Sequence, residues 1–221
     1  MRRIKKLDDK KKTQLGFIHQ FIPSNNSKGN SSTLLLLHGT GGNENDLIPI
    51  ARMLNPANGC ILSPLGKVLE NGMPRFFRRL SEGVFDIEDL KFRTHELVEF
   101  IENASKLYSF DLEHIIAVGY SNGANIASSI LLLRPEILST AILFRPMVPF
   151  IPDTLPNLIS KNIFICAGEW DPIVPRQNTE KLFDIFKKTH ANVSIHWQKS
   201  GHELGQEEIL SAKEWLSHHI S

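Results

Sequence analysis

Ser121 stands within a G-x-S-x-G pattern, residues 119–123, directly after an apolar run and before a segment of helical character. The glycines permit the sharp strand-to-helix turn that presents a nucleophilic serine above a sheet. The same turn leaves the backbone N–H of Asn122 near a helix N-terminus, where developing negative charge is stabilised. The pattern therefore predicts a nucleophilic serine. A chance match in a turn rich in Gly and Ser is the alternative, and partner residues elsewhere in the chain argue against it.

A serine hydroxyl is a weak nucleophile near neutral pH, so it needs a base and an acid that orients the base. With this type of turn, the expected chain order is nucleophile, acid, histidine. Asp171 follows the apolar run 162–167 and lies in a loop. Glu169 is nearer to the end of that run and is the rival acid. We favour Asp171, because Pro172 bends its loop and could point the short side chain across the strand ends.

Among the histidines, His202 has the position expected of the base. It lies in a loop next to Gly201, just after the apolar run 193–197. His196 lies inside that run and is interpreted as part of a strand alternation. His38 ends another apolar run, before a glycine-rich stretch, and is expected to brace that loop by hydrogen bonds rather than to move a proton. No pair of histidines has zinc-ligand spacing with a credible third ligand, so we predict no metal.

Short β-rich runs alternate with longer segments of helical period, and these elements must position the candidate residues. Strands are expected at residues 15–22, 33–38, 60–62, 114–119, 139–144, 162–167 and 193–197, and helices at 46–54, 87–108, 122–133, 177–189 and 203–220. This alternation predicts an open, mostly parallel α/β sheet with helices on both faces. Ligands bind beyond the carboxyl ends of such strands, where each candidate residue falls. Residues 64–86 show no clear period and are expected to form a long functional loop.

Composition and charge narrow the class of protein. The chain has 221 residues, 41% of them hydrophobic, and a net charge of +1. It is therefore neither disordered nor fibrous, and no global field would attract nucleic acid or a membrane. We expect one domain at residues 13–221, preceded by a basic and mobile arm at residues 1–12 that lacks the apolar region of a secretory signal. Cys60 and Cys166 are expected to be reduced thiols, which fits a cytoplasmic chain.

Four stretches together resemble the phospholipase/carboxylesterase family of α/β-hydrolases, which includes the acyl-protein thioesterases: residues 38–42, 119–123, 171–175 and 200–202. The stretch 70–79 is similar to a bacterial carboxylesterase branch, some members of which are associated with hydroquinone resistance. The resemblance runs from about residue 34 to residue 202. It implies an α/β-hydrolase fold with a single mostly parallel sheet and no large lid domain.

The resemblance also implies specific roles. Ser121, Asp171 and His202 would form a catalytic triad, and the backbone N–H groups of Thr40 and Asn122 would form an oxyanion hole. No cofactor is implied. Thioesterase members usually carry Gln and two Gly after the nucleophile, where this chain has Asn122, Gly123 and Ala124. The departure leaves the turn intact and argues against a protein-thioesterase role.

The expected function is therefore a serine carboxylesterase that hydrolyses small carboxylic esters through an acyl-enzyme. The alternatives are an acyl thioesterase or lysophospholipase for longer chains, and a non-catalytic binding module that kept the fold. The expected partner is a small-molecule ester, with no nucleic acid and no membrane, and a homodimer is left open.

The pocket residues are more ambiguous. Phe76 and Phe77 could line an acyl or aryl pocket or pack in the core. Three arginines of the same segment could bind a substrate carboxylate or pair with Glu82 or Asp86: Arg75, Arg78 and Arg79. Arg145 and Met147 follow a buried strand and are expected to shape the pocket.

Overall fold

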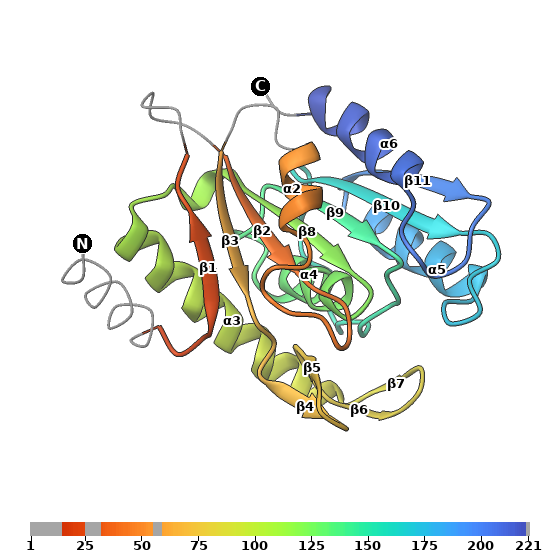
Figure 1. Cartoon of the computed structure of the whole chain (residues 1–221). Coiled ribbons are helices and arrows are strands. Elements are labelled where there is room, and N and C mark those ends of the chain that lie inside the picture. Colours follow the sequence, from red (N-terminus) through yellow and green to blue (C-terminus); the bar gives the residue numbers. More distant parts are fainter. Residues whose placement is uncertain (1–14, 25–31, 55–58, 220–221) are drawn as a thin grey trace.

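The computed structural model describes residues 15–24, 32–54 and 59–219. The proposed basic arm, residues 1–12, lies outside these ranges. A seven-stranded sheet forms the centre of the described chain (Figure 1). In spatial order its strands are β1 (His19–Ile22), β3 (Cys60–Pro64), β2 (Thr33–Leu37), β8 (Ile115–Tyr120), β9 (Thr140–Phe144), β10 (Asn162–Gly168) and β11 (Asn192–Gln198). Only β1 within this sheet runs antiparallel to its neighbour, so the expectation of a mostly parallel sheet is confirmed.

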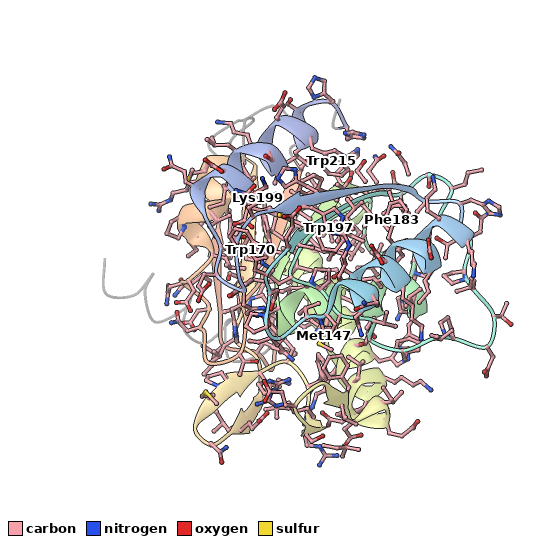
Figure 2. The ribbon with its side chains drawn as sticks, turned by 90° about the vertical axis from the view of Figure 1, so that its right-hand side faces the viewer. Met147, Trp170, Phe183, Trp197, Lys199 and Trp215 are labelled. Atoms are coloured by element: carbon pink, nitrogen blue, oxygen red, sulfur yellow. The ribbon has the colours of Figure 1, made fainter. Side chains whose placement is uncertain are left out.

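Helices cover both faces of this sheet. They are α2 (Ile48–Leu54), α3 (Ile87–Tyr108), α4 (Asn122–Leu133), α5 (Arg176–Lys188) and α6 (Gln206–Ser217), with a short 3₁₀ turn η1 (Leu112–His114) before β8. Helices α3, α4 and α5 pack on one face, and α2 and α6 pack on the other. Figure 2 shows α5 and α6 on opposite sides of the edge strand β11.

The central strands are apolar throughout because both of their faces are covered. In β2, Leu35 and Leu37 belong to the core under α3 and α4, whereas Leu34 and Leu36 belong to the core under α2. The leucines of this one strand therefore pack into both cores, and this packing fixes the position of the carboxyl end of β2.

The helices expected at residues 87–108 and 122–133 have the expected bounds. Helix α3 spans Ile87–Tyr108, begins after Asp86, whose carboxylate accepts the Asp89 N–H at 3.1 Å, and ends at Ser109 in a left-handed conformation. Helix α4 spans Asn122–Leu133. Helices α2 and α6 are shorter than expected, and α5 is shifted by one residue. Residues 43–47 form a turn in which Asp46 accepts the Asn43 N–H at 3.0 Å, so α2 begins only at Ile48.

The prediction of a long loop at residues 64–86 is wrong in part, because two β-hairpins lie there. They are built from β4 (Val68–Glu70) with β5 (Met73–Arg75), and β6 (Arg79–Ser81) with β7 (Val84–Phe85). Asn71 and Gly72 have φ values of 51° and 79°, which is the conformation of a two-residue hairpin turn. Neither hairpin joins the central sheet.

Candidate active site

Ser121 sits on a strained turn between β8 and α4. Its φ of 52° and ψ of −113° lie in a region that side-chain-bearing residues rarely adopt. Its N–H donates to the carbonyl of Phe144 at 2.8 Å, which ties the turn to β9. Space explains the second glycine of the motif: a Cβ on Gly123 would lie 1.9 Å from the Leu37 carbonyl oxygen. Strand β2 therefore passes so close to the first turn of α4 that only glycine fits.

The three residues of the expected triad come together at the carboxyl edge of the sheet. Ser121 follows β8, Asp171 follows β10 and His202 follows β11. The Ser121 Oγ lies 3.0 Å from His202 Nε2, and His202 Nδ1 lies 2.7 Å from Asp171 Oδ2. These contacts form a continuous hydrogen-bonded series from the hydroxyl to the carboxylate, within the distances that proton transfer requires.

The carboxylate of Asp171 is held from both sides. Its side chain is 1% exposed, and Oδ1 accepts the N–H groups of Ile173 at 2.8 Å and Val174 at 3.0 Å. Oδ2 is thereby left facing the histidine. Glu169, the rival acid, is exposed and does not reach this series. The structure thus brings Asp171 rather than Glu169 to His202.

The two expected oxyanion donors flank the serine. The N–H of Asn122 belongs to the first turn of α4, whose hydrogen-bond series starts only with Asn125 N–H donating to Ser121 O at 3.0 Å. Thr40 lies in the glycine-rich loop after β2, and both residues line the same pocket as Ser121. The hydroxyl of Thr40 accepts a hydrogen bond from Arg75 Nη1 at 2.7 Å, which anchors this loop to β5.

His38 braces the loop, as expected from its position. It is buried, its Nδ1 lies 2.6 Å from the Gly39 carbonyl, and its Nε2 accepts the Gly66 N–H at 2.9 Å. Burial lowers the pKa of His38, which keeps the ring neutral. Since both ring nitrogens are engaged, His38 is not available as a base for Ser121.

Arg145 does not line the pocket, so this part of the sequence prediction is wrong. Its φ of 55° turns the fully buried side chain beneath the loop that carries His202. There Nε donates to Gly201 O, and Nη2 donates to Glu203 O, each at 2.9 Å. The carboxylate of Glu208, also buried, pairs with the same guanidinium. Arg145 therefore holds the carbonyls on either side of His202.

Tyr120 is a residue that the sequence analysis missed. Its hydroxyl donates to the His202 carbonyl at 3.1 Å, and the two rings lie 5.6 Å apart between centroids. Burial raises the pKa of the Tyr120 hydroxyl, so it remains a donor. The sequence signal for a role of Tyr120 is its position directly before Ser121 in the G-x-S-x-G pattern.

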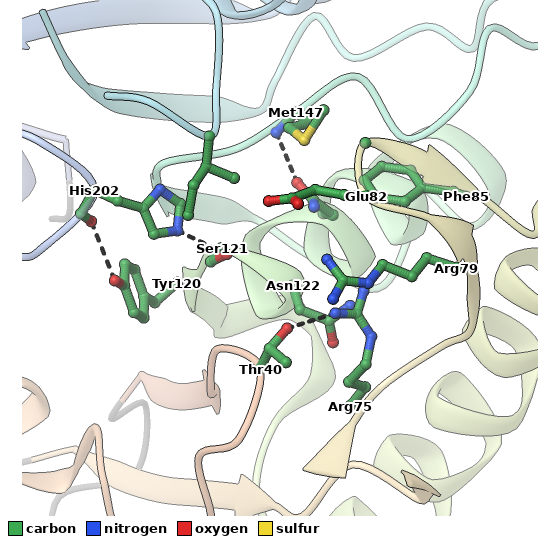
Figure 3. A pocket seen from close by; sticks show the side chains of 13 residues that line it. Thr40, Arg75, Arg79, Glu82, Phe85, Tyr120, Ser121, Asn122, Met147 and His202 are labelled. Carbon is green, nitrogen blue, oxygen red and sulfur yellow. Dashed lines mark hydrogen bonds between the residues drawn. The ribbon is translucent and has the colours of Figure 1, made fainter. Parts of the chain in front are cut away.

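A pocket of about 300 Å³ opens at Ser121 (Figure 3). It is lined by Thr40, Arg75, Arg79, Glu82, Gly83, Phe85, Tyr120, Ser121, Asn122, Asn125, Met147, Ile173 and His202. Met147 thus lies where the sequence analysis expected it. A second hollow of about 400 Å³ lies on the other side of the glycine-rich loop and shares Thr40 and Tyr120 with the first.

Phe76, Phe77 and Arg78 do not line the pocket, and the structure shows the second alternative given for each of them. Both phenylalanines are buried in the core under α3, since β5 leads the chain inward at that point. Arg78 points outward with 62% of its side chain exposed, and it pairs with Asp86 at 2.9 Å.

No metal or membrane feature accompanies the site in the part of the chain that the structure describes. Residues 15–24, 32–54 and 59–219 contain no group of three or more His, Cys, Asp or Glu arranged to hold a metal ion. Within the same ranges, no helix has the length and apolarity needed to cross a bilayer.

The comparison with known proteins identifies the family. The model of the Phospholipase/Carboxylesterase family matches residues 19–220, which is most of the chain. The chain belongs to the phospholipase/carboxylesterase family. Within this family it is 48% identical over 194 residues to MhqD of Bacillus subtilis (strain 168), a protein whose name assigns it to the hydrolases; the match covers 87% of this chain and 96% of MhqD.

Solved structures agree with this assignment to the carboxylesterase family. The Bacillus cereus carboxylesterase is 47% identical, with a TM-score of 0.91 and coverage of 95% of this chain and 97% of that one. YahD, whose structure contains malic acid, is 32% identical, with a TM-score of 0.84 and coverage of 91% and 98%. The protein is therefore a carboxylic ester hydrolase of the α/β-hydrolase fold.

Proposed function

We propose that this protein is a serine carboxylesterase that hydrolyses small carboxylic esters through an acyl-enzyme on Ser121. The observation that carries the proposal is the hydrogen-bonded series Ser121–His202–Asp171 at the wall of the pocket. A serine, a base and a buried carboxylate in this order match the requirements for acyl transfer.

We propose the following steps, which the geometry supports. Ser121 Oγ attacks the ester carbonyl carbon while His202 Nε2 takes the hydroxyl proton. The N–H groups of Thr40 and Asn122 stabilise the negative charge on the carbonyl oxygen. His202 then gives its proton to the leaving alcohol, and a water molecule activated by the same ring cleaves the acyl-enzyme. Asp171 keeps the proton on His202 Nδ1 and stabilises the charged ring.

The size of the pocket supports small substrates. A volume of about 300 Å³ is at the lower end for ligand sites, and the structure of the relative YahD contains a small molecule, malic acid. We expect short acyl groups to be preferred over the long chains that a lysophospholipase accepts.

The proposal is tested with a fluorophosphonate probe and a chain-length series of 4-nitrophenyl esters. Ser121→Ala should abolish labelling and lower kcat by roughly 10⁴- to 10⁶-fold, the range of triad knockouts in serine hydrolases. Ser160→Ala is the matched control, because Ser160 is exposed and lies outside the pocket lining. A loss below about tenfold for Ser121→Ala would show that another group is the nucleophile.

A further inference from the structure

One wall of the pocket carries two arginines that share a single acidic partner. Arg79 contacts Glu70 through Nε at 2.8 Å and Nη2 at 2.7 Å, and Arg75 Nε lies 3.2 Å from the same carboxylate. Both arginines line the pocket that contains Ser121. Since arginine stays protonated in proteins, two positive charges face one negative charge. Among these three side chains positive charge is therefore in excess, and Glu82 is the acidic residue of the pocket lining.

The hydrogen-bond capacity of this wall is also incompletely used. The hydrogen bonds of Arg75 use Nε and Nη1, and the contacts of Arg79 use Nε and Nη2. Beside them, Asn122 is buried, and its Oδ1 accepts the Phe76 N–H at 2.7 Å. Its Nδ2 is buried without a hydrogen-bond partner in the described part of the chain. Unsatisfied buried donors are costly, so the site lacks an acceptor.

These donors gather in one place. In the view of Figure 3 the side chain of Asn122 overlaps the guanidinium groups of Arg75 and Arg79, and all three residues line the same pocket. Donors of this kind, which belong to one pocket lining and are partly uncommitted, fit the oxygen atoms of a carboxylate, which can accept several hydrogen bonds at once.

The position of the donors relative to the triad indicates which half of the ester they would bind. In Figure 3, His202 lies on one side of Ser121 and the two arginines lie on the other. The alcohol must leave on the His202 side, because His202 Nε2 supplies its proton. The second hollow is lined by Tyr120 and by Glu203 and Leu204, which directly follow His202 in the chain. The acyl group is then directed toward the arginines.

We propose that the preferred substrates are monoesters of short dicarboxylic acids, whose free carboxylate binds Arg79, Arg75 and the Asn122 amide. The proposal rests on the proposed function of Ser121. Apolar side chains of the same pocket would contact the methylene groups between the two carboxyl carbons: Phe85, Met147 and Ile173. During turnover the bond from Ser121 Oγ to the acyl carbon forms and the ester C–O bond breaks. The alcohol leaves with the serine proton, and water then releases the dicarboxylate.

Glu82 adds a negative charge to the pocket that contains the two arginines. It is exposed and lines the pocket, and Figure 3 shows it across from the arginines. Its negative charge disfavours an anionic acyl group, so its neutralisation should have the opposite effect to the loss of Arg79.

The test compares two substrates of equal length that differ in charge. Monoethyl glutarate is compared with its monoamide, the ethyl ester in which a carboxamide replaces the free carboxylate. The corresponding pairs made from succinate and adipate show which chain length is hydrolysed best. The native enzyme should favour the acid over the amide in kcat/KM by about tenfold or more, the effect of a charge-assisted hydrogen bond. Arg79→Gln should lower this ratio by about ten- to hundredfold. Glu82→Gln should raise it by about two- to fivefold, as for an exposed charge.

Arg78→Gln is the matched control. It removes a guanidinium from the adjacent position in the same hairpin segment, but Arg78 is exposed and does not line the pocket, so the ratio should stay at the native value. If Arg79→Gln does not fold, two measurements remain. One is the Glu82→Gln ratio, and the other is inhibition of 4-nitrophenyl acetate hydrolysis, in which glutarate should act at lower concentration than its monoamide.

A native ratio of one or less for all three lengths would overturn the proposal, as would an unchanged ratio in Arg79→Gln. A failure of the proposed function, as opposed to a failure of this substrate proposal, would give a different result. In that case Ser121→Ala would retain hydrolysis of the neutral ester, whatever the ratio between the two substrates.

Discussion

Arg145→Met tests whether the buried ion pair beneath the histidine loop supports folding and catalysis separately. The guanidinium and the Glu208 carboxylate both have 0% of their side chains exposed. Removing one partner leaves the other charge buried, which costs about 3–5 kcal/mol. For a chain of this length, that loss corresponds to a fall in Tm of roughly 6–20 °C.

The double variant Arg145→Met/Glu208→Met separates the two effects. It removes both charges of the Arg145–Glu208 pair, and two apolar side chains of similar volume fill the space, so stability should return to within about 1–2 kcal/mol of the native value. Asp171, whose Oδ2 lies 3.9 Å from Arg145 Nε, keeps its hydrogen bond with His202. The carbonyls of Gly201 and Glu203 would still lack their donor. The loop of His202 should then be less well placed, and kcat should stay about ten- to hundredfold low.

The assays are urea unfolding followed by circular dichroism, and steady-state hydrolysis of 4-nitrophenyl acetate. A cost below about 1 kcal/mol for Arg145→Met would contradict the argument from the buried pair. A double variant that regains both stability and native kcat would contradict the positioning role of Arg145. Binding of substrate should change less than kcat, because Arg145 does not line the pocket.

Three further predictions follow from local contacts. Asp171→Asn should lower kcat by roughly 10³- to 10⁴-fold, whereas Glu169→Gln, with both variants checked by circular dichroism, should cost less than about tenfold because Glu169 is exposed. Gly123→Ala should lower the free energy of unfolding in urea by about 1–3 kcal/mol or more, because its Cβ would meet the Leu37 carbonyl; native stability would refute the close approach. The lowered pKa of His38 means that below its ordinary value of 6.5 the unfolded chain takes up more protons than the folded one. Stability should therefore fall as the pH falls below 6.5, and His38→Gln should reduce that slope in a series of urea titrations; an equal slope would assign the effect to other groups.

The sequence predicted the sheet and helices α3 and α4 well because their signals are local. Helix α3 has a strong helical period and a capping aspartate, and the elbow motif sets the start of α4. The hairpins at residues 68–85 were missed because their strands are only two or three residues long. The pair Asn71-Gly72 was a usable hairpin signal that the sequence analysis passed over.

The sequence could predict only those site residues whose place follows from their position directly after a parallel strand. Ser121, Asp171 and His202 each follow a parallel strand, so the sheet itself brings them to one edge, and their hydrogen-bond contact is seen in the structure. Their catalytic roles stay proposals. Arg145 also follows a strand, but a single positive φ turns it beneath the His202 loop instead of into the pocket. Its partner Glu208 is distant in sequence, so no local pattern could identify the pair.

The separation of the two hairpins from the central sheet has a consequence for how specificity can change. The segment from Gly66 to Asp86 supplies Arg75, Arg79, Glu82 and Phe85 to the pocket, yet it pairs with none of the sheet strands. It is fastened by the buried Phe76 and Phe77 and by the hydrogen bond from the Gly66 N–H to His38 Nε2 at 2.9 Å. The segment can therefore change in sequence without altering the strand pairing of the central sheet. Substitutions in these hairpins that keep the anchors should change which substrate fits the pocket, while the reacting groups remain undisturbed.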